Sequence, residues 1–133
     1  TAPSYSDVVQ DISEFLSQRL ADVSGVGIDL DRVIIDPGFG FGKTAEQNFE
    51  LLARLSELQG IGQPVLVGLS RKSMISSVLD RLPDQRMVAS VALALMAVER
   101  GARIVRVHDV AATFDALSMW QTMRYALSQS QPS

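Results

Sequence analysis

The chain has 133 residues, of which 47% are hydrophobic and 20% charged, and its formal net charge is −3. A chain of this length and composition forms at most one domain with one core, and it lacks the basic excess typical of proteins that bind nucleic acid or anionic membranes. The sequence contains no cysteine, which excludes disulfides and thiolate metal sites and fits a reducing compartment such as the cytoplasm.

The predicted elements alternate between helix and strand along the chain. Apolar residues at helical spacing, and β-branched runs that end in polar or turn residues, indicate them. In chain order they are a helix at 5–20, a strand at 31–36, a helix at 44–58, a strand at 64–70, a short helical piece at 74–79, a helix at 83–100, a strand at 103–109 and a helix at 110–127. Thr44 and Gln47 form a capping box that starts the second helix. The most apolar stretch, residues 87–98, is shorter than the ~18 residues of a membrane span and predicts a buried helix.

Strands that alternate with helices pair in parallel and are joined by crossover helices. The three strand ends recur at similar intervals, as in the βα unit of a barrel, which needs ~250 residues for eight units. Because the chain is shorter and does not begin with methionine, we expect residues 1–133 to be a partial barrel domain of a longer protein. The expected fold is therefore α/β, the C-terminal half of a (β/α)₈ TIM barrel with three parallel strands whose two faces are both covered. A small doubly wound domain of three strands is the alternative.

Polar side chains gather near the carboxyl end of each predicted strand. Side chains two positions apart point to the same face of a strand, and these polar residues are in phase with apolar or glycine positions behind them. The residues in question are Asp36 in the first strand, Gly68 and Ser70 in the second, and Arg106 and His108 in the third. In parallel α/β folds this end of the sheet carries the functional site. The pattern predicts that these groups surround one cavity.

The stretch DPGFGFGKT, residues 36–44, has the residue types of a phosphate-binding loop. The P-loop pattern requires glycine where this chain has Pro37, which lacks a backbone N–H, and the dinucleotide-binding pattern requires glycine where it has Lys43. Both nucleotide-binding motifs are therefore excluded. The loop offers instead the Asp36 carboxylate, glycines that permit close approach of a flat ligand, and the aromatic rings of Phe39 and Phe41.

Three motifs carry a resemblance to a known family. In order and spacing, IIDPGFGFGKT, VLVGLSRKSMI and IVRVHDV resemble the last three strand-end motifs of the dihydropteroate synthases. The resemblance covers essentially the whole chain. It implies a (β/α)₈ barrel of roughly twice this length and a transferase that joins dihydropterin methyl pyrophosphate to 4-aminobenzoate in folate synthesis, a target of sulfonamides.

The resemblance also implies roles for individual residues. Asp36 resembles the pterin-binding aspartate, whose carboxylate accepts two hydrogen bonds side by side. Lys72 resembles the lysine that reaches the pterin carbonyl and lines the aminobenzoate site, and Gly40 and Gly68 would permit close approach of the pterin. From the residues alone, Asp36 is equally an Asp-Pro turn residue. Lys72 alone is more often a solvated lysine at a helix start.

Further roles follow from the same motifs. Ser70 and Phe41 resemble residues beside the aminobenzoate. Arg106 and His108 resemble the site for the leaving pyrophosphate, so Lys72, Arg106 and His108 are the candidate catalytic residues. An exposed strand end with an ion pair to Asp109 is the alternative for Arg106 and His108.

Charged residues outside these roles are interpreted more simply. Arg71, which falls between Ser70 and Lys72 in the alternation, is expected to point away and make a structural contact. Lys43 and Arg86 are interpreted as solvated charges.

The resemblance further implies Mg²⁺ bound with the pyrophosphate, with its protein ligand in the first barrel strand and none in this chain. It also implies a homodimer formed through helices near the C-terminus, small-molecule substrates, and no partner of nucleic acid or membrane. We expect the isolated chain to be inactive. The alternatives are another pterin-binding barrel, such as a methyltetrahydrofolate methyltransferase, and a half-barrel without catalytic activity that binds a partner through its open edges.

Overall fold

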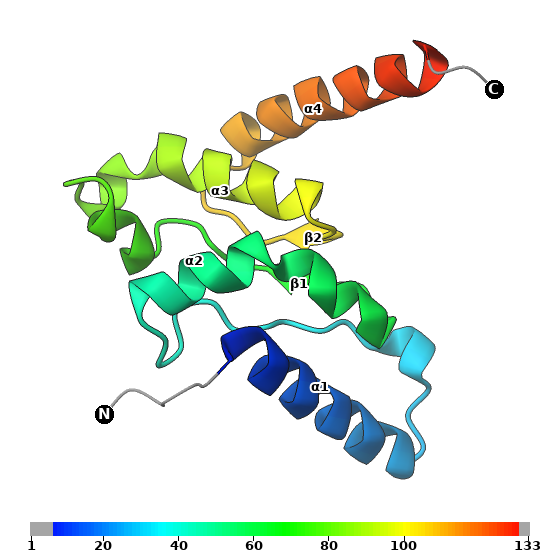
Figure 1. Ribbon diagram of the computed structural model, residues 1–133. Helices are drawn as coiled ribbons and strands as arrows, with labels where there is room; N and C mark the ends of the chain where they lie inside the picture. Colours follow the sequence, from blue (N-terminus) through cyan, green and yellow to red (C-terminus); the bar gives the residue numbers. More distant parts are fainter. Residues whose placement is uncertain (1–6, 131–133) are drawn as a thin grey trace.

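The computed structural model describes residues 7–130 as an α/β arrangement with much helix and a short parallel sheet (Figure 1). The α-helices are α1 (Val8–Gly25), α2 (Ala45–Ala53), α3 (Met87–Glu99) and α4 (Val110–Ser130). The strands are β1 (Leu66–Val67) and β2 (Ile104–Val105). The 3₁₀ helices are η1 (Leu30–Arg32), η2 (Leu55–Ile61), η3 (Ser73–Ser77) and η4 (Pro83–Gln85). The predicted order of helices is confirmed, and residues 5 and 6 of the first predicted helix lie outside the described residues.

Local hydrogen bonds explain where the first two α-helices begin. The Asp7 carboxylate accepts hydrogen bonds from the N–H groups of Val9 and Gln10, both at 3.1 Å, at the start of α1. The predicted capping box is confirmed, because Thr44 Oγ1 accepts from the Gln47 N–H at 3.1 Å and Gln47 Oε1 accepts from the Thr44 N–H at 2.9 Å. Each cap satisfies N–H groups that have no partner within the first turn.

The sheet is shorter than predicted. β1 and β2 pair in parallel with Leu66 opposite Ile104, and the third segment contributes one parallel bridge, between Ile35 and Val65. The prediction of a strand from residue 31 is wrong in its first half, because η1 occupies that stretch. There the Asp29 carboxylate accepts a hydrogen bond from the Asp31 N–H at 3.0 Å, which favours a turn over extended backbone.

The two faces of the sheet differ in burial. Ile35, Val65 and Val67 are at most 3% exposed and face the helices, whereas Ile34 is 49% and Ile104 38% exposed on the other face. The expectation that helices cover both faces is therefore wrong for the described residues. The open face is the one that carries the polar residues of the strand ends.

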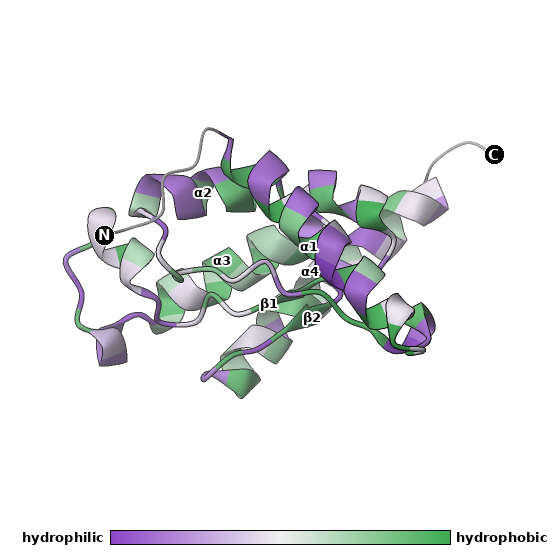
Figure 2. Cartoon of the chain, turned by 90° about the horizontal axis from the view of Figure 1, so that it is seen from below, coloured by the Kyte–Doolittle hydropathy of each residue, from purple (hydrophilic) through white to green (hydrophobic). Residues whose placement is uncertain are grey.

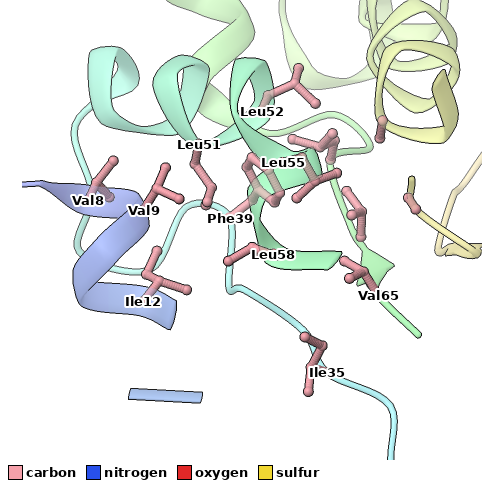
Figure 3. Close-up of a cluster of buried hydrophobic side chains, with 14 of the residues drawn as sticks. Val8, Val9, Ile12, Ile35, Phe39, Leu51, Leu52, Leu55, Leu58 and Val65 are labelled. Atoms are coloured by element: carbon pink, nitrogen blue, oxygen red, sulfur yellow. The ribbon is translucent and has the colours of Figure 1, made fainter. Parts of the chain in front are cut away.

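The core lies between the buried face of the sheet, α1, α2 and η2. Figure 3 shows Leu51 and Leu55 pointing toward Phe39 of the glycine-rich loop, with Val8 and Ile12 of α1 beside them. Burial of each large apolar side chain contributes about 1.5–3 kcal/mol relative to exposure. The core thereby fixes the start of the 36–44 loop, because Phe39 is buried there.

The last two α-helices, α3 and α4, leave several large apolar side chains exposed to solvent. Figure 2 shows α3 largely in the green of hydrophobic residues. The prediction that this helix is buried holds for Leu93 and Ala97 but not for Val88, which is 77% exposed. α4 packs against α3 and then extends away from the other elements (Figure 1), with Phe114 and Met119 exposed. Within residues 7–130, no helix combines the length and the apolar character required to cross a membrane.

Candidate functional site

The ends of the second and third strand segments surround a cavity of about 320 Å³. Gly68, Ser70, Lys72, Arg106 and His108 line this cavity, together with Val107. We call it the strand-end cavity. Two strand ends thus bring together five of the eight residues that the sequence singled out, because the parallel register continues beyond the short strands.

Arg106 lies directly across from Gly68. Its backbone N–H donates a hydrogen bond to the Val67 carbonyl at 2.9 Å, which fixes the register of the two segments. A methyl group at Gly68 would come within 2.7 Å of Arg106 Nη2, so the guanidinium occupies the space that a side chain at position 68 would need. Because position 68 is glycine, the exposed guanidinium can lie against the backbone of this residue inside the cavity.

Ser70 and His108 form the second pair of the strand-end cavity. The His108 N–H donates to Ser70 Oγ at 3.1 Å, and the same oxygen lies 2.9 Å from His108 Nδ1. The hydroxyl can donate its own proton to Nδ1, and Nε2 then carries the ring proton of the neutral imidazole. Ser70 is 9% exposed whereas His108 is exposed, so the contact is partly buried. The pair presents one further N–H donor beside the Arg106 guanidinium.

Lys72 connects the strand-end cavity to the glycine-rich loop. Its ammonium donates a hydrogen bond to the Phe39 carbonyl at 3.0 Å and lies 5.1 Å from the centroid of the Phe41 ring, a cation–π contact. Gly40 has φ +91°, and a methyl group there would lie 3.4 Å from Lys72 Cδ. Lys72 is therefore not a solvated lysine but a residue held against the loop. Phe41 itself is 70% exposed.

Asp36 lines a neighbouring cavity of about 330 Å³, between the loop and α1. Phe41 and Lys43 line it too, so the expectation that Asp36 shares one cavity with Arg106 and His108 is wrong. Asp36 Oδ1 accepts a hydrogen bond from the Gly38 N–H at 2.8 Å, as in an Asp-Pro turn, while Oδ2 has no hydrogen bond among the described residues. Asp36 therefore serves as the turn residue that the Asp-Pro sequence predicts, and its side chain is exposed.

Lys43 is not the solvated charge that the sequence suggested. Its ammonium donates to the Gly38 carbonyl at 2.6 Å across the loop. Burial lowers the pKa of Lys43, the positive charge of Lys72 lowers it further, and the Asp36 carboxylate opposes both effects. Lys43 from within the loop and Lys72 from the second strand end therefore both place an ammonium group against the loop, whose own negative charge is Asp36.

Arg71 points away from the cavity, as predicted. Its Nη2 lies 2.9 Å from Asp109 Oδ1, so Asp109 pairs with Arg71 and the alternative pair with Arg106 or His108 is not observed. The interpretation of Arg86 as a solvated charge is wrong, since its Nη1 donates to the Arg71 carbonyl at 3.0 Å. Sequence reasoning also missed Ser90, whose Oγ accepts from the Arg71 N–H at 2.7 Å. A lone serine in the apolar stretch 87–98 was the available signal.

A larger cavity lies elsewhere. It measures about 570 Å³ between α2, η3 and α3 and is lined mainly by apolar side chains such as Phe49, Ile75 and Val88. Its polar lining consists of Arg81 and Gln85, fewer polar side chains than line the strand-end cavity, which is therefore the better candidate despite its smaller size. Among residues 7–130, no group of three or more His, Cys, Asp or Glu side chains could hold a metal ion.

The sequence of this chain is similar to those of known proteins. Residues 1–108 match a family model described as pterin binding enzyme. A dihydropteroate synthase of Haemophilus influenzae is 54% identical over 119 residues, which are 90% of this chain and 43% of the relative. One of Escherichia coli K12 is 43% identical over 116 residues, 87% of this chain and 41% of the relative.

Solved structures agree with the sequence matches. A Xanthomonas albilineans dihydropteroate synthase with 4-aminobenzoic acid superposes with a TM-score of 0.91 at 50% identity over 98% of this chain and 46% of the other. The same enzyme in complex with 7,8-dihydropteroate gives a TM-score of 0.91 at 50% identity over 99% of this chain and 49% of the other. The chain spans less than half the length of each of these relatives.

Proposed function

We propose, from the premise that this chain belongs to the family of pterin-binding enzymes, that it supplies part of the active site of a dihydropteroate synthase. The enzyme would condense 6-hydroxymethyl-7,8-dihydropterin pyrophosphate with 4-aminobenzoate to give 7,8-dihydropteroate and pyrophosphate. The observation that carries the proposal is the convergence of Lys72, Arg106 and His108 on the strand-end cavity.

The strand-end cavity suits the leaving pyrophosphate. The Arg106 guanidinium can form two parallel hydrogen bonds to phosphate oxygens, and the His108 imidazole adds a third donor. Within the described part of the chain no carboxylate lines this cavity, and Asp109, the acidic residue next to His108, is already paired with Arg71. The net charge of the lining residues is therefore positive, which favours a dianionic or trianionic group.

Lys72 would lie beside both substrates. Asp36 Oδ2 could accept from the pterin, while Gly40 and Gly68 let the side chains of Lys72 and Arg106 lie close to the backbone, where both could reach the ring. Ser70, Phe41 and Lys72 would flank the aminobenzoate, which the exposed Phe41 ring could cover with its face.

The reaction is a displacement at the CH₂ group of the pterin. The amine nitrogen forms a bond to this carbon, the carbon–oxygen bond to pyrophosphate breaks, and the nitrogen then loses a proton to solvent. Arg106 and His108 stabilise the charge that develops on the departing oxygen, while Asp36 favours positive character in the pterin ring. The aromatic amine is already a nucleophile, so much of the acceleration comes from holding both substrates in line.

A half-barrel architecture is part of the proposal. Ile34, Leu66 and Ile104 form an apolar row on the open face of the sheet, with Ile34 and Ile104 well exposed. A row of this kind is typical of the packed interior of a (β/α)₈ barrel, which further strands would complete. Three parallel strands of such a barrel would extend the short pairing at Ile35, β1 and β2.

Magnesium fits this chain only through the substrate. The described residues hold no cluster of acidic or imidazole groups for a metal, and the lining of the strand-end cavity is cationic. We therefore propose that Mg²⁺ arrives with the pyrophosphate and takes its protein ligand from outside residues 1–133.

A homodimer and a cytoplasmic location complete the proposal. Phe114, Met119 and Tyr125 of α4 are each at least 67% exposed, and a second copy of the chain could cover them. Sedimentation of the complete polypeptide would measure a dimer, and Met119→Glu should convert it to a monomer. Cell fractionation tests the location.

The alternative enzyme class is less well supported by the residues. A methyltetrahydrofolate methyltransferase should lack both the sequence SRKS at 70–73 and the Arg106 and His108 pair, and this chain has both. A half-barrel without catalytic activity remains the other alternative, and turnover separates it from the synthase.

A hybrid polypeptide tests the proposed function. In it, this chain replaces the matching 43% of the Haemophilus influenzae relative, and formation of 7,8-dihydropteroate is measured. We expect turnover from the hybrid, a loss of about 10²-fold with Arg106→Ala, and none from the 133-residue chain alone. Arg100→Ala is the matched control, because Arg100 bonds the Met96 carbonyl at the end of α3, outside the cavity. A folded hybrid without activity, or an Arg106→Ala variant as active as Arg100→Ala, would contradict the proposal.

A further inference from the structure

Arg71 has an unusual backbone conformation at the centre of the site. Its φ is +57°, and among the described residues it is the one non-glycine residue with positive φ. The Lys72 N–H donates to the Leu69 carbonyl at 3.3 Å, so residues 69–72 form a turn with Arg71 in its third position. A turn with positive φ at this position normally takes glycine or asparagine there. An arginine stores strain instead, and strain of this kind persists only where surrounding contacts hold it.

Three contacts hold Arg71 in this conformation. The Arg71 N–H donates to Ser90 Oγ at 2.7 Å, and the Arg71 carbonyl accepts from Arg86 Nη1 at 3.0 Å. Its guanidinium makes a forked contact with Asp109, at 2.9 Å and 3.4 Å. Ser90 is buried in α3 and its hydroxyl donates onward to the Arg86 carbonyl, so its position is fixed from both sides. Backbone and side chain are thus held by different elements.

These contacts connect the turn to the opposite strand end. Asp109 directly follows His108, while Arg71 lies directly between Ser70 and Lys72. The ion pair therefore adds a second connection, outside the cavity, to the contact between Ser70 and His108 inside it. With both connections in place, the positions of Ser70, Lys72 and His108 are set relative to one another.

We propose that Arg71 is a positioning residue whose ion pair with Asp109 holds Ser70 and Lys72 in register with His108, a proposal that rests on the proposed synthase function. Glycine would suit the turn better, and the arginine is therefore retained for its link to Asp109. The link acts more on the aminobenzoate, which Ser70 and Lys72 both flank, than on the pterin, which Lys72 shares with Asp36. Asp36 belongs to another segment and does not depend on it.

The test compares three variants in the complete polypeptide that carries this chain. Arg71→Gly relieves the backbone and removes the ion pair, Asp109→Asn removes only the charge, and Arg71→Lys keeps a charge without the fork. We expect Arg71→Gly and Asp109→Asn each to lower kcat/KM for 4-aminobenzoate by about tenfold or more, with a smaller effect on the KM of the pterin substrate. The double variant should be no worse than either single variant, and Arg71→Lys should recover part of the loss.

Arg54→Ala is the matched control. The Arg54 side chain is 32% exposed, against 33% for Arg71, and it forms an equally close forked contact, with Glu57, far from the cavity. We expect this variant to lower the melting temperature and leave both KM values unchanged. Arg71→Gly should show the opposite pattern, a nearly unchanged melting temperature with a raised KM for 4-aminobenzoate. Kinetic losses that follow the melting temperature across all variants would overturn the proposal.

A second measurement does not depend on turnover. Amide hydrogen exchange reports on the Lys72 N–H, bonded to Leu69, and on the His108 N–H, bonded to Ser70. Asp109→Asn should speed exchange at both amides, whereas Arg54→Ala should leave them unchanged. Unchanged exchange in Asp109→Asn would refute the positioning role of Arg71. An inactive wild-type polypeptide with fast exchange in Asp109→Asn would contradict the synthase function alone.

Discussion

A methyl group at Gly68 should displace Arg106 without unfolding the protein. The added carbon would lie 2.7 Å from Arg106 Nη2, and an ordinary contact starts at 3.4 Å, so the guanidinium must move by about 0.7 Å. It can do so, because it is the far end of a flexible, exposed side chain. Gly68 does not have positive φ, so alanine fits its backbone.

Gly68→Ala should therefore weaken the binding of an anion while leaving the free energy of unfolding nearly unchanged. Replacing glycine by alanine at a compatible position stabilises by about 0.4–1 kcal/mol through the unfolded chain, which offsets the displaced guanidinium. Hydrogen bonds to charged groups contribute about 1.5–3 kcal/mol, and every 1.4 kcal/mol is tenfold in affinity. Because Arg106 is exposed and screened by solvent, we expect the low end, a loss of about tenfold in affinity for inorganic pyrophosphate.

Titration calorimetry with inorganic pyrophosphate and thermal unfolding test this expectation together. Gly25→Ala is the control, since a methyl group there meets nothing within 4 Å and the residue does not have positive φ. The double variant with Arg106→Ala should bind no more weakly than Arg106→Ala alone, because both changes act on one group. Wild-type affinity in Gly68→Ala, or a loss that persists without the Arg106 side chain, would refute the assignment of Arg106 to the anion site.

Three further predictions follow from other parts of the structure. Leu58→Ala should lower the free energy of unfolding in urea by about 2–5 kcal/mol, because Leu58 is 0% exposed; a loss below about 1 kcal/mol would contradict its place in the core. Lys72→Met should release the 36–44 loop from the Phe39 carbonyl and the Phe41 ring, seen as faster amide exchange at Gly40 with little change in melting temperature. Hydrogen bonds from Gln10 and Arg54 lower the pKa of Asp7, and a hydrogen bond from Arg54 lowers that of Glu57. The stability from these two carboxylates is thus present at neutral pH and is lost as the pH falls below their ordinary values of 3.8 and 4.5, and Arg54→Ala should flatten this acid limb of melting temperature against pH.

Several features of the site were accessible from the sequence because their causes are local. The capping box at Thr44 and the exclusion of a P-loop by Pro37 each depend on residues within a few positions of each other. The common face of Gly68 and Ser70, and of Arg106 and His108, follows from the alternation of a strand. The prediction that Arg71 makes a structural contact is confirmed by its ion pair with Asp109, although Arg71 lies in a turn with φ +57°, where the alternation of a strand does not apply.

Other predictions were wrong for two different reasons. Of the first predicted strand, only the bridge at Ile35 is observed. The Asp29 carboxylate accepts a hydrogen bond from the Asp31 N–H, which favours a turn over extended backbone. Lys43 and Arg86 were taken for solvated charges, yet each bonds a backbone carbonyl, at Gly38 and Arg71. Nothing in the residue type of a lysine or an arginine tells which carbonyl lies within its reach.

The sequence by itself determined the alternation of helices and strands and the set of polar groups at the strand ends, since periodicity and short-range hydrogen bonds depend only on neighbours along the chain. Tertiary structure alone decided that Asp36 lines a separate cavity from Arg106, and that Arg71 is held by Ser90 and Asp109. Those contacts join residues 19 and 38 positions apart. Their distances are set by how the segments pack, which hydrophobic burial and strand register fix only when the whole chain has folded.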